Sequence, residues 1–518
     1  MSVLDSYIPT QQRVSRWAWV PEEPVPENAS LAVDRSTPIC LSFSAGISPI
    51  VRKRITYAFR VFAAIYNHKV VDFGSQADAV CLVYGNSVAH EQGPKAFHVP
   101  ALYRIRDLRE RPPALSKHRY ASEDVWLFHG VDPATENPDW LGEIFEWISS
   151  SSELSATRRD SAGRICFSES VFRRQGISPR KPYSMMVMAW LKNSLENGRT
   201  KQAFAKAPSP VPGVEHAVIC CHDIDFYYAG MRSALTRLIK NLGISYSLYR
   251  SWSFFSSNVA NIAELLKGKR VGDYLPPLLM AGKKYGFQST LFVVSQQRHW
   301  RDPNYRLEHL TRHLESALSQ GFSIGLQGSY GSVVEALDLA SEIPALEEAV
   351  GRKPRGSRQH WLRFDKHDKL FDAVEQARLI YDSSIGFSKT VGYRGGACFA
   401  FPPYNFRKEQ PYEFLEIPLA IMDGGLIHES LSSGEPAGEI AEEVLRESRR
   451  LGWGGIATLW HNPIEPLQVP VEINNIFWEC VKNQVRFQER WMTADEFVER
   501  AISRYQNAGL LQSVRFDA

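Results

Sequence analysis

From residue 217 onward the sequence alternates short apolar runs with amphipathic helical stretches, and this alternation restricts the fold more than any other feature. The helical stretches show leucines at helical spacing between residues 307 and 318, ended by Gly321, and a second set between 370 and 377. Short strands that alternate with helices are typical of parallel β/α architecture. We therefore expect a distorted (β/α) barrel, with candidate strands at 217–221, 289–294, 323–326, 414–419 and 456–460.

The part before residue 206 predicts a smaller α/β unit. Apolar residues at helical spacing from 51 to 65 precede a β-rich run at 79–84, and further helical stretches cover 140–148 and 185–191. A chain of 518 residues also exceeds the roughly 250–300 residues that one core supports. We predict an N-terminal α/β accessory domain at 1–205, with an extended arm over its first thirty residues, and the barrel domain at 206–518.

Composition and charge limit the classes of partner. Hydrophobic residues make up 44% of the chain, which excludes a disordered protein. The 60 Lys and Arg residues nearly balance the 57 Asp and Glu residues, so the total charge predicts no footprint for nucleic acid or for an anionic membrane. No leader-like start and no apolar run of about 20 residues is visible, so we expect no integral membrane segment and a cytoplasmic location. The seven scattered cysteines predict reduced thiols rather than disulfides.

Polar residues follow several of the predicted strands. The run His222-Asp223-Ile224-Asp225 follows the first strand of the barrel, Gln327 follows the third, and His461 follows the last. In a parallel β/α barrel these side chains converge on the C-terminal face, where ligands bind. Two carboxylates with histidines suit a divalent metal and a general base. The alternative is that the two aspartates only cap the next helix.

The order and spacing of eight motifs between residues 215 and 500 resemble the polysaccharide deacetylase branch of the carbohydrate esterases, in the long form with an extra N-terminal domain. A fainter similarity covers residues 50–200. The motifs are His222-Asp223-Ile224-Asp225, 286–292 (GFQSTLF), 324–330 (IGLQGSY), 357–364 (SRQHWLRF), 381–384 (YDSS), 393–396 (YRGG), 415–418 (LEIP) and 459–462 (LWHN).

The resemblance implies removal of an acetyl group from an N-acetylated sugar in surface polysaccharide metabolism. It assigns Asp223 as the base on a metal-bound water, Asp225 as a ligand of a divalent metal such as zinc, and Arg358 as the partner that keeps the base ionised. It assigns His461 as the acid that protonates the leaving amine.

One departure from the family pattern affects the metal. The family has a histidine ligand where Gln327 stands, and many members have a second where Gly331 stands. The amide oxygen of Gln327 is itself a candidate metal ligand, although an amide is a poor substitute for imidazole toward zinc. His222 and His360 are the candidates to replace the missing ligands, and the alternative for each is a supporting hydrogen bond beside the site.

Several residues near the motif ends are candidates to contact a sugar. Arg394 either binds an anionic group or braces its loop, and the rings of Tyr330, Trp361 and Trp460 are candidates to stack against sugar rings. The carbohydrate is the only partner that the sequence indicates, and it leaves the sugar, the linkage and the oligomeric state open.

Three functions remain open on the sequence alone. The first is a metal-dependent carbohydrate N-deacetylase, and the second is a catalytically impaired carbohydrate-binding or assembly protein, for which Gln327 is the reason. The third is a metal-independent hydrolase that uses Asp223 and His461. The joint presence of Asp223, Asp225, Arg358 and His461 favours the first, and we expect the N-terminal domain to cover one side of the barrel mouth.

Overall fold

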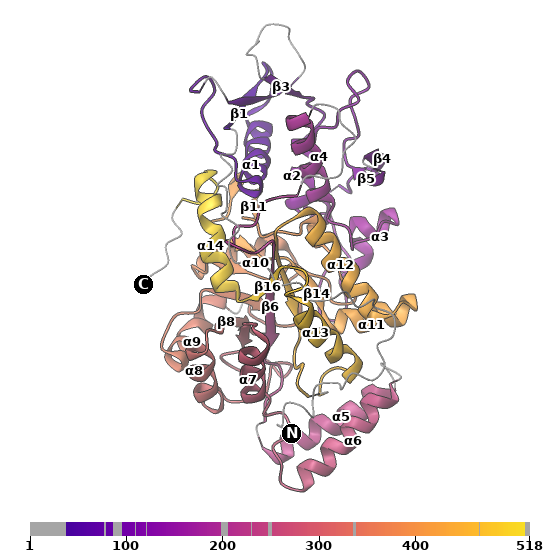
Figure 1. Ribbon diagram of the computed structural model, residues 1–518, viewed down its shortest axis with the longest axis vertical. Helices are drawn as coiled ribbons and strands as arrows, with labels where there is room; N and C mark the ends of the chain where they lie inside the picture. Colours follow the sequence, from indigo (N-terminus) through magenta and orange to yellow (C-terminus); the bar gives the residue numbers. More distant parts are fainter. Residues whose placement is uncertain are drawn as a thin grey trace.

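A computed structural model describes residues 38–76, 79–85, 96–108, 110–120, 122–197, 206–228, 230–246, 251–334, 338–465 and 467–512. The predicted N-terminal arm lies outside these residues. The fold is α/β, with a small parallel sheet at one end and a larger parallel half-barrel below it (Figure 1).

The N-terminal part holds a three-stranded parallel sheet in the order β1-β2-β3, packed against helices. Its longest helix, α1, begins after Ser48, whose side chain accepts a hydrogen bond from the amide of Val51, and ends at Asn67 in the left-handed conformation. The elements are β1 (Ile39–Phe43), α1 (Pro49–Tyr66), β2 (Val80–Tyr84), β3 (Ala96–Val99), the hairpin β4 (Ser116–Tyr120) and β5 (Glu123–Leu127), α2 (Trp140–Ile148), α3 (Val171–Gln175) and α4 (Tyr183–Asn197).

The C-terminal part is a nine-stranded parallel sheet in the order β13-β10-β9-β8-β7-β6-β15-β14, with β16 also paired to β6. The predicted distorted β/α barrel is thereby confirmed. The strands are β6 (His216–Asp223), β7 (Thr290–Val293), β8 (Ser323–Gly328), β9 (Gly356–Gln359), β10 (Tyr381–Asp382), β13 (Leu415–Glu416), β14 (Leu419–Met422), β15 (Gly454–Leu459) and β16 (Glu489–Met492), with the short pair β11 (Tyr404–Asn405) and β12 (Gln410–Pro411) beside them.

Helices connect the strands and cover the curved sheet, as short parallel crossovers require. They are α5 (Met231–Ile244), α6 (Trp252–Leu266), α7 (Leu275–Tyr285), α8 (Thr311–Ser319), α9 (Ile343–Val350), α10 (His367–Gln376), α11 (Asp423–Ser433), α12 (Ala437–Leu451), α13 (Val471–Asn483) and α14 (Ala494–Asn507). None of the described helices is long and apolar enough to cross a bilayer.

The central strand β6 is buried along its whole length, as its apolar sequence predicts for a strand covered on both faces. Four of the five predicted barrel strands are found with small shifts of their ends. The predicted strand at 414–419 is wrong, because Pro418 separates two short strands, β13 and β14. Strands β9, β10 and β16 were not predicted, since their sequences are short and rich in polar residues that are nevertheless buried.

One continuous hydrophobic core joins the N-terminal part to the barrel. Phe145 of α2 packs edge-on against Tyr404, with ring centroids 5.0 Å apart, and a buried ion pair of 2.6 Å links Glu153 to Arg394. The division of the chain near residue 206 stays a prediction, but the N-terminal part is packed onto the barrel rather than tethered to it. All seven cysteines are free thiols.

Candidate active site

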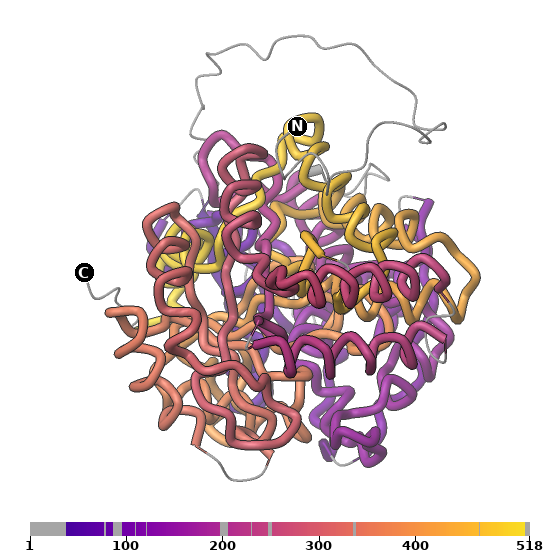
Figure 2. Tube along the Cα trace, turned by 90° about the horizontal axis from the view of Figure 1, so that it is seen from below, coloured from indigo at the N-terminus to yellow at the C-terminus, as the bar shows by residue number. Residues whose placement is uncertain are grey.

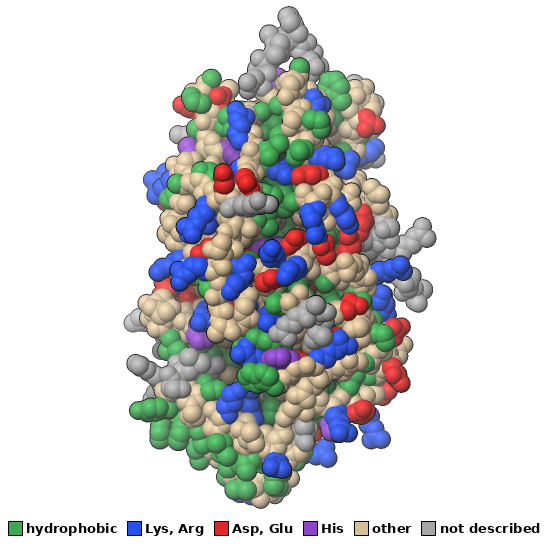
Figure 3. Space-filling view, turned by 180° about the vertical axis from the view of Figure 1, so that it is seen from behind, with side chains coloured by type: hydrophobic (Ala, Val, Ile, Leu, Met, Phe, Trp, Pro, Cys, Tyr) green, Lys and Arg blue, Asp and Glu red, His purple; other side chains and the backbone are tan. Residues whose placement is uncertain are grey.

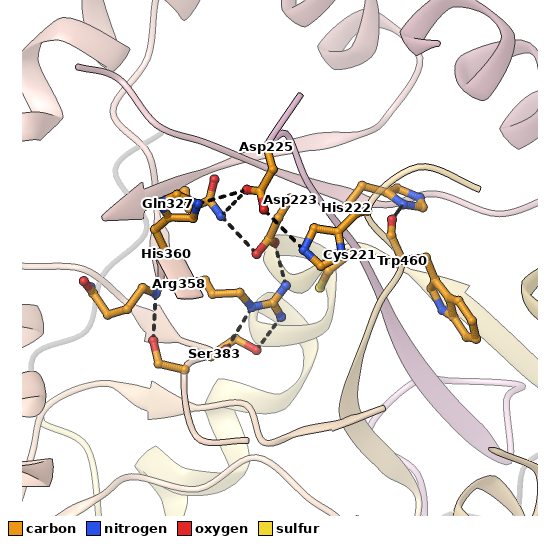
Figure 4. Close-up of polar contacts among 12 residues, drawn as sticks. Cys221, His222, Asp223, Asp225, Gln327, Arg358, His360, Ser383 and Trp460 are labelled. Atoms are coloured by element: carbon orange, nitrogen blue, oxygen red, sulfur yellow. Dashed lines mark hydrogen bonds and ion pairs between the residues drawn. The ribbon is translucent and has the colours of Figure 1, made fainter. Parts of the chain in front are cut away.

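A buried ion pair between β6 and β9 forms the floor of the site. Nη1 of Arg358 lies 3.0 Å from Oδ1 of Asp223, and both side chains are almost completely buried (Figure 4). The remaining guanidinium nitrogens donate to Ser383, Nε to its carbonyl and Nη2 to its hydroxyl, each at 2.9 Å. Burial raises the pKa of Asp223, and the charge of Arg358 opposes that rise. The orientation of this carboxylate is therefore fixed by a fully partnered arginine.

Gln327 of β8 lies between the two aspartates of the sequence motif. Its Nε2 donates to Oδ2 of Asp223 at 3.1 Å and to Oδ1 of Asp225 at 3.0 Å (Figure 4). The opposite amide orientation would place Oε1 against two carboxylate oxygens, so the hydrogen bonds fix the assignment. Oε1 is buried and has no hydrogen-bond partner among the described residues. The amide thus supplies the donors that two neighbouring carboxylates need.

Two histidines face the second aspartate. Nε2 of His360 lies 3.5 Å from Asp225 Oδ1, and Nε2 of His461 lies 3.4 Å from Asp225 Oδ2. The other nitrogen of each ring contacts a further carboxylate, since Nδ1 of His360 is 3.2 Å from Asp302 and Nδ1 of His461 is 2.8 Å from Asp423. The result is a row of alternating carboxylates and imidazoles centred on Asp225.

These contacts set the protonation states in the row. Burial lowers the pKa of His360, but pairing with Asp225 and Asp302 outweighs burial and raises it to about 9. For His461 burial also lowers the pKa, and Asp423 and Asp225 together hold it well above its usual value. Burial raises the pKa of Asp225, yet the two histidines hold it well below its usual range. At neutral pH both imidazoles are protonated and Asp225 is ionised.

The row reaches solvent at its centre. The side chains of Asp225 and His461 are 21% and 17% exposed, whereas Asp223, Arg358 and His360 are buried. A ligand therefore meets Asp225 and His461 first.

The structure brings Asp223, Asp225, Arg358 and His461 into one network, as the sequence predicted. It adds Asp302 and Asp423, which sequence reasoning missed. Asp423 directly follows β14, so the rule that functional side chains follow strand ends would have found it, had the strand been placed correctly. Asp302 lies in the loop after β7 and carries no sequence signal.

The prediction that His222 helps to hold a metal is wrong. His222 lies within β6, and alternate residues of a strand point to opposite faces, so its ring points away from Asp223. Its Nδ1 is hydrogen-bonded to the carbonyl of Trp460 (Figure 4). Its Nε2 lies 3.8 Å from the Cys220 sulfur. Burial lowers the pKa of His222 to about 4, so it is a neutral core residue.

Two predicted sugar contacts are also corrected. Trp460 is buried against Phe477, with ring centroids 5.6 Å apart, and no face of its indole is free for a sugar. Arg394 is buried and donates to Glu153 through Nη2 at 2.6 Å and to the Gly386 carbonyl through Nη1 at 2.9 Å. These contacts support the interpretation that Arg394 braces its loop, and not that it binds an anionic group of the sugar.

Trp361 is the predicted sugar contact with an open ring, since 44% of it is exposed. Trp361 and Leu362 both adopt left-handed backbone conformations, with φ of 64° and 51°, which bulky side chains rarely do. Nη1 of Arg164 donates to the Trp361 carbonyl at 2.9 Å and stabilises this turn from the N-terminal part. The ring of Tyr330 is buried beneath, 5.8 Å edge-on from that of Trp361, so it supports the platform without being open itself.

The donor set does not fit a divalent metal as it is arranged. Gln327 presents its amide nitrogen, not its oxygen, to Asp225, and each oxygen of Asp225 faces an imidazole nitrogen whose other ring nitrogen contacts a further carboxylate. A metal ligand must be an unprotonated nitrogen or an oxygen. Over the described ranges, no three His, Cys, Asp or Glu side chains are grouped so that they could hold a metal ion.

Comparisons with known proteins show a likeness of fold. No protein-family model and no curated relative matches the sequence. A putative polysaccharide deacetylase from Mycobacterium smegmatis aligns with 60% of this chain and 98% of its own, at 17% identity and a TM-score of 0.37. Peptidoglycan deacetylase PdaC from Bacillus subtilis aligns with 57% of this chain and 95% of its own, at 10% identity and a TM-score of 0.28.

A third structure is a CE4 family pseudoenzyme from Bacillus anthracis, which aligns with 61% of this chain and 82% of its own, at 12% identity and a TM-score of 0.27. The three alignments cover 60%, 57% and 61% of this chain. At these identities the likeness concerns the course of the chain, and the chemistry of the site rests on its own residues.

We expect Gln327→Leu to destabilise the protein by about 1–3 kcal/mol, because the buried carboxylate of Asp223 and the partly exposed one of Asp225 then lose their shared donor. Urea denaturation measures the change in the free energy of unfolding. Gln320→Leu at the exposed end of α8 is the control and should change stability by less than about 0.5 kcal/mol. Equal stabilities of Gln327→Leu and the wild type would contradict the bridging role.

The raised pKa of His360 predicts a stability loss at alkaline pH. Its pKa is 6.5 in the unfolded chain and about 9 in the folded protein, so the stabilisation is complete below about pH 6.5 and is lost as the pH rises through 9. Urea denaturation between pH 6 and 10 should show a loss on the order of 3 kcal/mol that His360→Gln removes. Parallel pH profiles of the two proteins would show that His360 is neutral in the folded state.

Proposed function

We propose that this protein is a hydrolase that removes the N-acetyl group from a sugar in surface polysaccharide metabolism. The observation that carries this proposal is the presence, in one network, of a buried carboxylate with a raised pKa and a partly exposed imidazolium with a raised pKa. Pairs of titratable groups with distinct protonation states are what acid–base hydrolysis of an amide requires.

Each residue of the network has a role in this reaction. Asp223, oriented by Arg358, accepts a proton as water adds to the acetyl carbonyl. His461, oriented by Asp423, gives its proton to the sugar nitrogen as the C–N bond breaks, so that acetic acid, which ionises in solvent, and the amine leave. The proton held by Asp223 then restores the protonated state of His461, and the enzyme returns to its starting state. Asp225 keeps His461 protonated between turnovers.

Trp361 is the residue that we propose contacts the sugar of the substrate. Its ring stands beside His360, with the guanidinium of Arg301 over it at 5.3 Å from the centroid. The residue is 44% exposed, and its exposed part is apolar surface of the kind that stacks on a sugar ring. The N-terminal part holds this ring in place through Arg164. This contact supports the expectation that the accessory part shapes the mouth of the barrel.

A second candidate is a saccharide-binding protein without turnover, and the position of Gln327 favours it. The amide of Gln327 engages both Asp223 and Asp225, and the side chain of Asp223 is only 4% exposed. A base that is already hydrogen-bonded on both oxygens must exchange one partner before it accepts a proton from water. A measurement of acetate release distinguishes the two functions, because only the hydrolase releases acetate.

We expect Asp223→Asn to lower acetate release from N-acetylhexosamine oligomers by about 10²–10⁴-fold, because the substitution keeps the shape and removes the basic oxygen. His461→Ala should cause a comparable loss, and the double variant should lose little more, since both residues serve one tetrahedral intermediate. Asp338→Asn, at the exposed start of a short 3-10 helix, is the control and should leave the rate unchanged.

Two results would contradict this assignment. Release that survives Asp223→Asn points to another base. A wild-type protein that binds N-acetylated oligomers and releases no acetate from any of them has the binding function instead.

A divalent metal is the cofactor that the sequence resemblance implies, and Gln327 makes its role testable. We expect the wild type to bind zinc weakly and Gln327→His to bind it at least about tenfold more tightly, because imidazole is a better zinc ligand than an amide. Isothermal titration with zinc measures both affinities, and Gln320→His at the surface should equal the wild type. Tight binding of one zinc by the wild type would overturn our account of the donor set.

A further inference from the structure

The helical hairpin formed by α5 (Met231–Ile244) and α6 (Trp252–Leu266) stands at one end of the molecule. It is inserted between β6 and β7, and the chain enters it directly after Asp225. Figure 1 shows its two helices at the lower end, and Figure 2, which looks at the molecule from that end, shows them side by side. A small hydrophobic cluster separate from the main core packs its base, made of Phe226, Ala234, Leu238, Leu265, Val271 and Leu467.

A buried hydrogen-bond network fixes the two helices to each other and to the barrel. The side-chain nitrogen of Asn241 donates to Oδ1 of Asn258 at 2.8 Å and to the carbonyl of Leu467 at 2.7 Å. The side of the hairpin that faces the barrel is therefore fixed by buried hydrogen bonds and apolar packing.

The outer face of the hairpin is apolar and uncovered. Tyr246 is 86% exposed, Trp252 is 78% exposed and Leu266 is 67% exposed, and Met231, Ile239 and Val259 are also exposed. Figure 3 shows these hydrophobic side chains gathered at the lower end of the molecule. A helix on a protein surface normally has one apolar stripe, directed at the core.

Helix α6 has two such stripes. Trp252, Val259 and Leu266 are spaced by seven residues and share an exposed side. Phe254 and Leu265 lie on the other side and are buried. The three residues of the second stripe belong to none of the hydrophobic clusters that the described residues form, and contiguous exposed apolar surface of this kind marks an interaction site.

The charges of the hairpin indicate the partner. Among the described residues from 231 to 273, Glu264 and Asp273 are the acidic side chains, against the basic residues Arg232, Arg237, Lys240, Lys267, Lys269 and Arg270. Glu264 pairs with Lys267 and Lys269, and Asp273 lies 3.9 Å from Arg270, so the net excess is carried by α5. The nearly neutral balance of the whole chain conceals this local excess. A second copy of the chain would bring two basic surfaces together, which disfavours self-association.

Two further aromatic residues lie on the same edge of the barrel. Trp300 follows β7 and Trp361 follows β9, and both are exposed. Parallel strands end on the same side, so these rings stand on the edge from which the hairpin leaves. Exposed Trp and Tyr beside an apolar and basic helix are typical of elements that lie in a membrane interface.

We propose that the helical hairpin docks the protein onto the surface of an anionic lipid bilayer, with its outer apolar face among the headgroups and without spanning the bilayer. The docking itself does not depend on the proposed hydrolysis. It has one consequence that rests on the proposed function: the site next to the hairpin base would meet a saccharide that is carried on a lipid.

The experiment is co-sedimentation of the full chain with vesicles of phosphatidylcholine alone and of phosphatidylcholine with phosphatidylglycerol. We expect binding to the anionic vesicles that weakens as salt is raised. The charge variant Arg232→Glu with Lys240→Glu should bind at least about tenfold more weakly, since each basic residue near such a surface contributes about fivefold. The apolar variant Trp252→Ser with Leu266→Ser should lose binding by about tenfold or more.

Matched controls change equally exposed residues elsewhere. Lys353→Glu with Lys366→Glu matches the charge variant, and Val485→Ser with Leu431→Ser matches the apolar one. Both controls should bind like the wild type. Circular dichroism verifies that all variants are folded.

Three results would overturn the proposal. They are no binding to anionic vesicles, binding that survives both hairpin variants, and a concentration-dependent dimer that the hairpin variants abolish. Acetate release from lipid-carried and soluble sugars tests the consequence separately: equal rates remove the preference for a lipid-carried sugar, and no release from either contradicts the proposed function while leaving the docking result standing.

Discussion

The carboxylate of Asp223 is the charge on which the site depends, because it lies almost fully inside the barrel. A buried charge is tolerated only where charged and hydrogen-bonding partners surround it. Arg358 supplies the opposite charge and Gln327 supplies a neutral donor, each from a different strand of the parallel sheet. The curvature of the half-barrel brings β8 and β9 within reach of β6. The fold therefore supplies the partners that an ionised Asp223 needs.

The same amide links this buried pair to the more exposed part of the site. Gln327 connects Asp223 to Asp225, and Asp225 in turn faces two histidines that are each backed by another carboxylate. Every acidic and basic group of the network is partnered within the chain. The proposed base, Asp223, and the proposed acid, His461, thus have their charges balanced by side chains without a metal ion. For this reason the proposed chemistry uses side chains alone.

Much of this could be predicted from the sequence, and the failures have physical reasons. The buried apolar run of β6 and the spacing of α1 and α2 predict their elements well, because one periodicity dominates each. Strands such as β9 were not predicted, since they bury polar residues that belong to the site. The direction in which His222 points depends on whether the strand ends before or after it, which apolar patterning does not define. Asp302 reaches His360 from a loop, and such contacts exist only in three dimensions.

A crystal structure of the protein grown with zinc, with anomalous data at the zinc edge, tests the central claim most directly. Our account predicts no anomalous density beside Asp225, with Nε2 of Gln327 within hydrogen-bond distance of both Asp223 and Asp225. An ion bonded to Asp225, His360 and the oxygen of a rotated Gln327 side chain would contradict it.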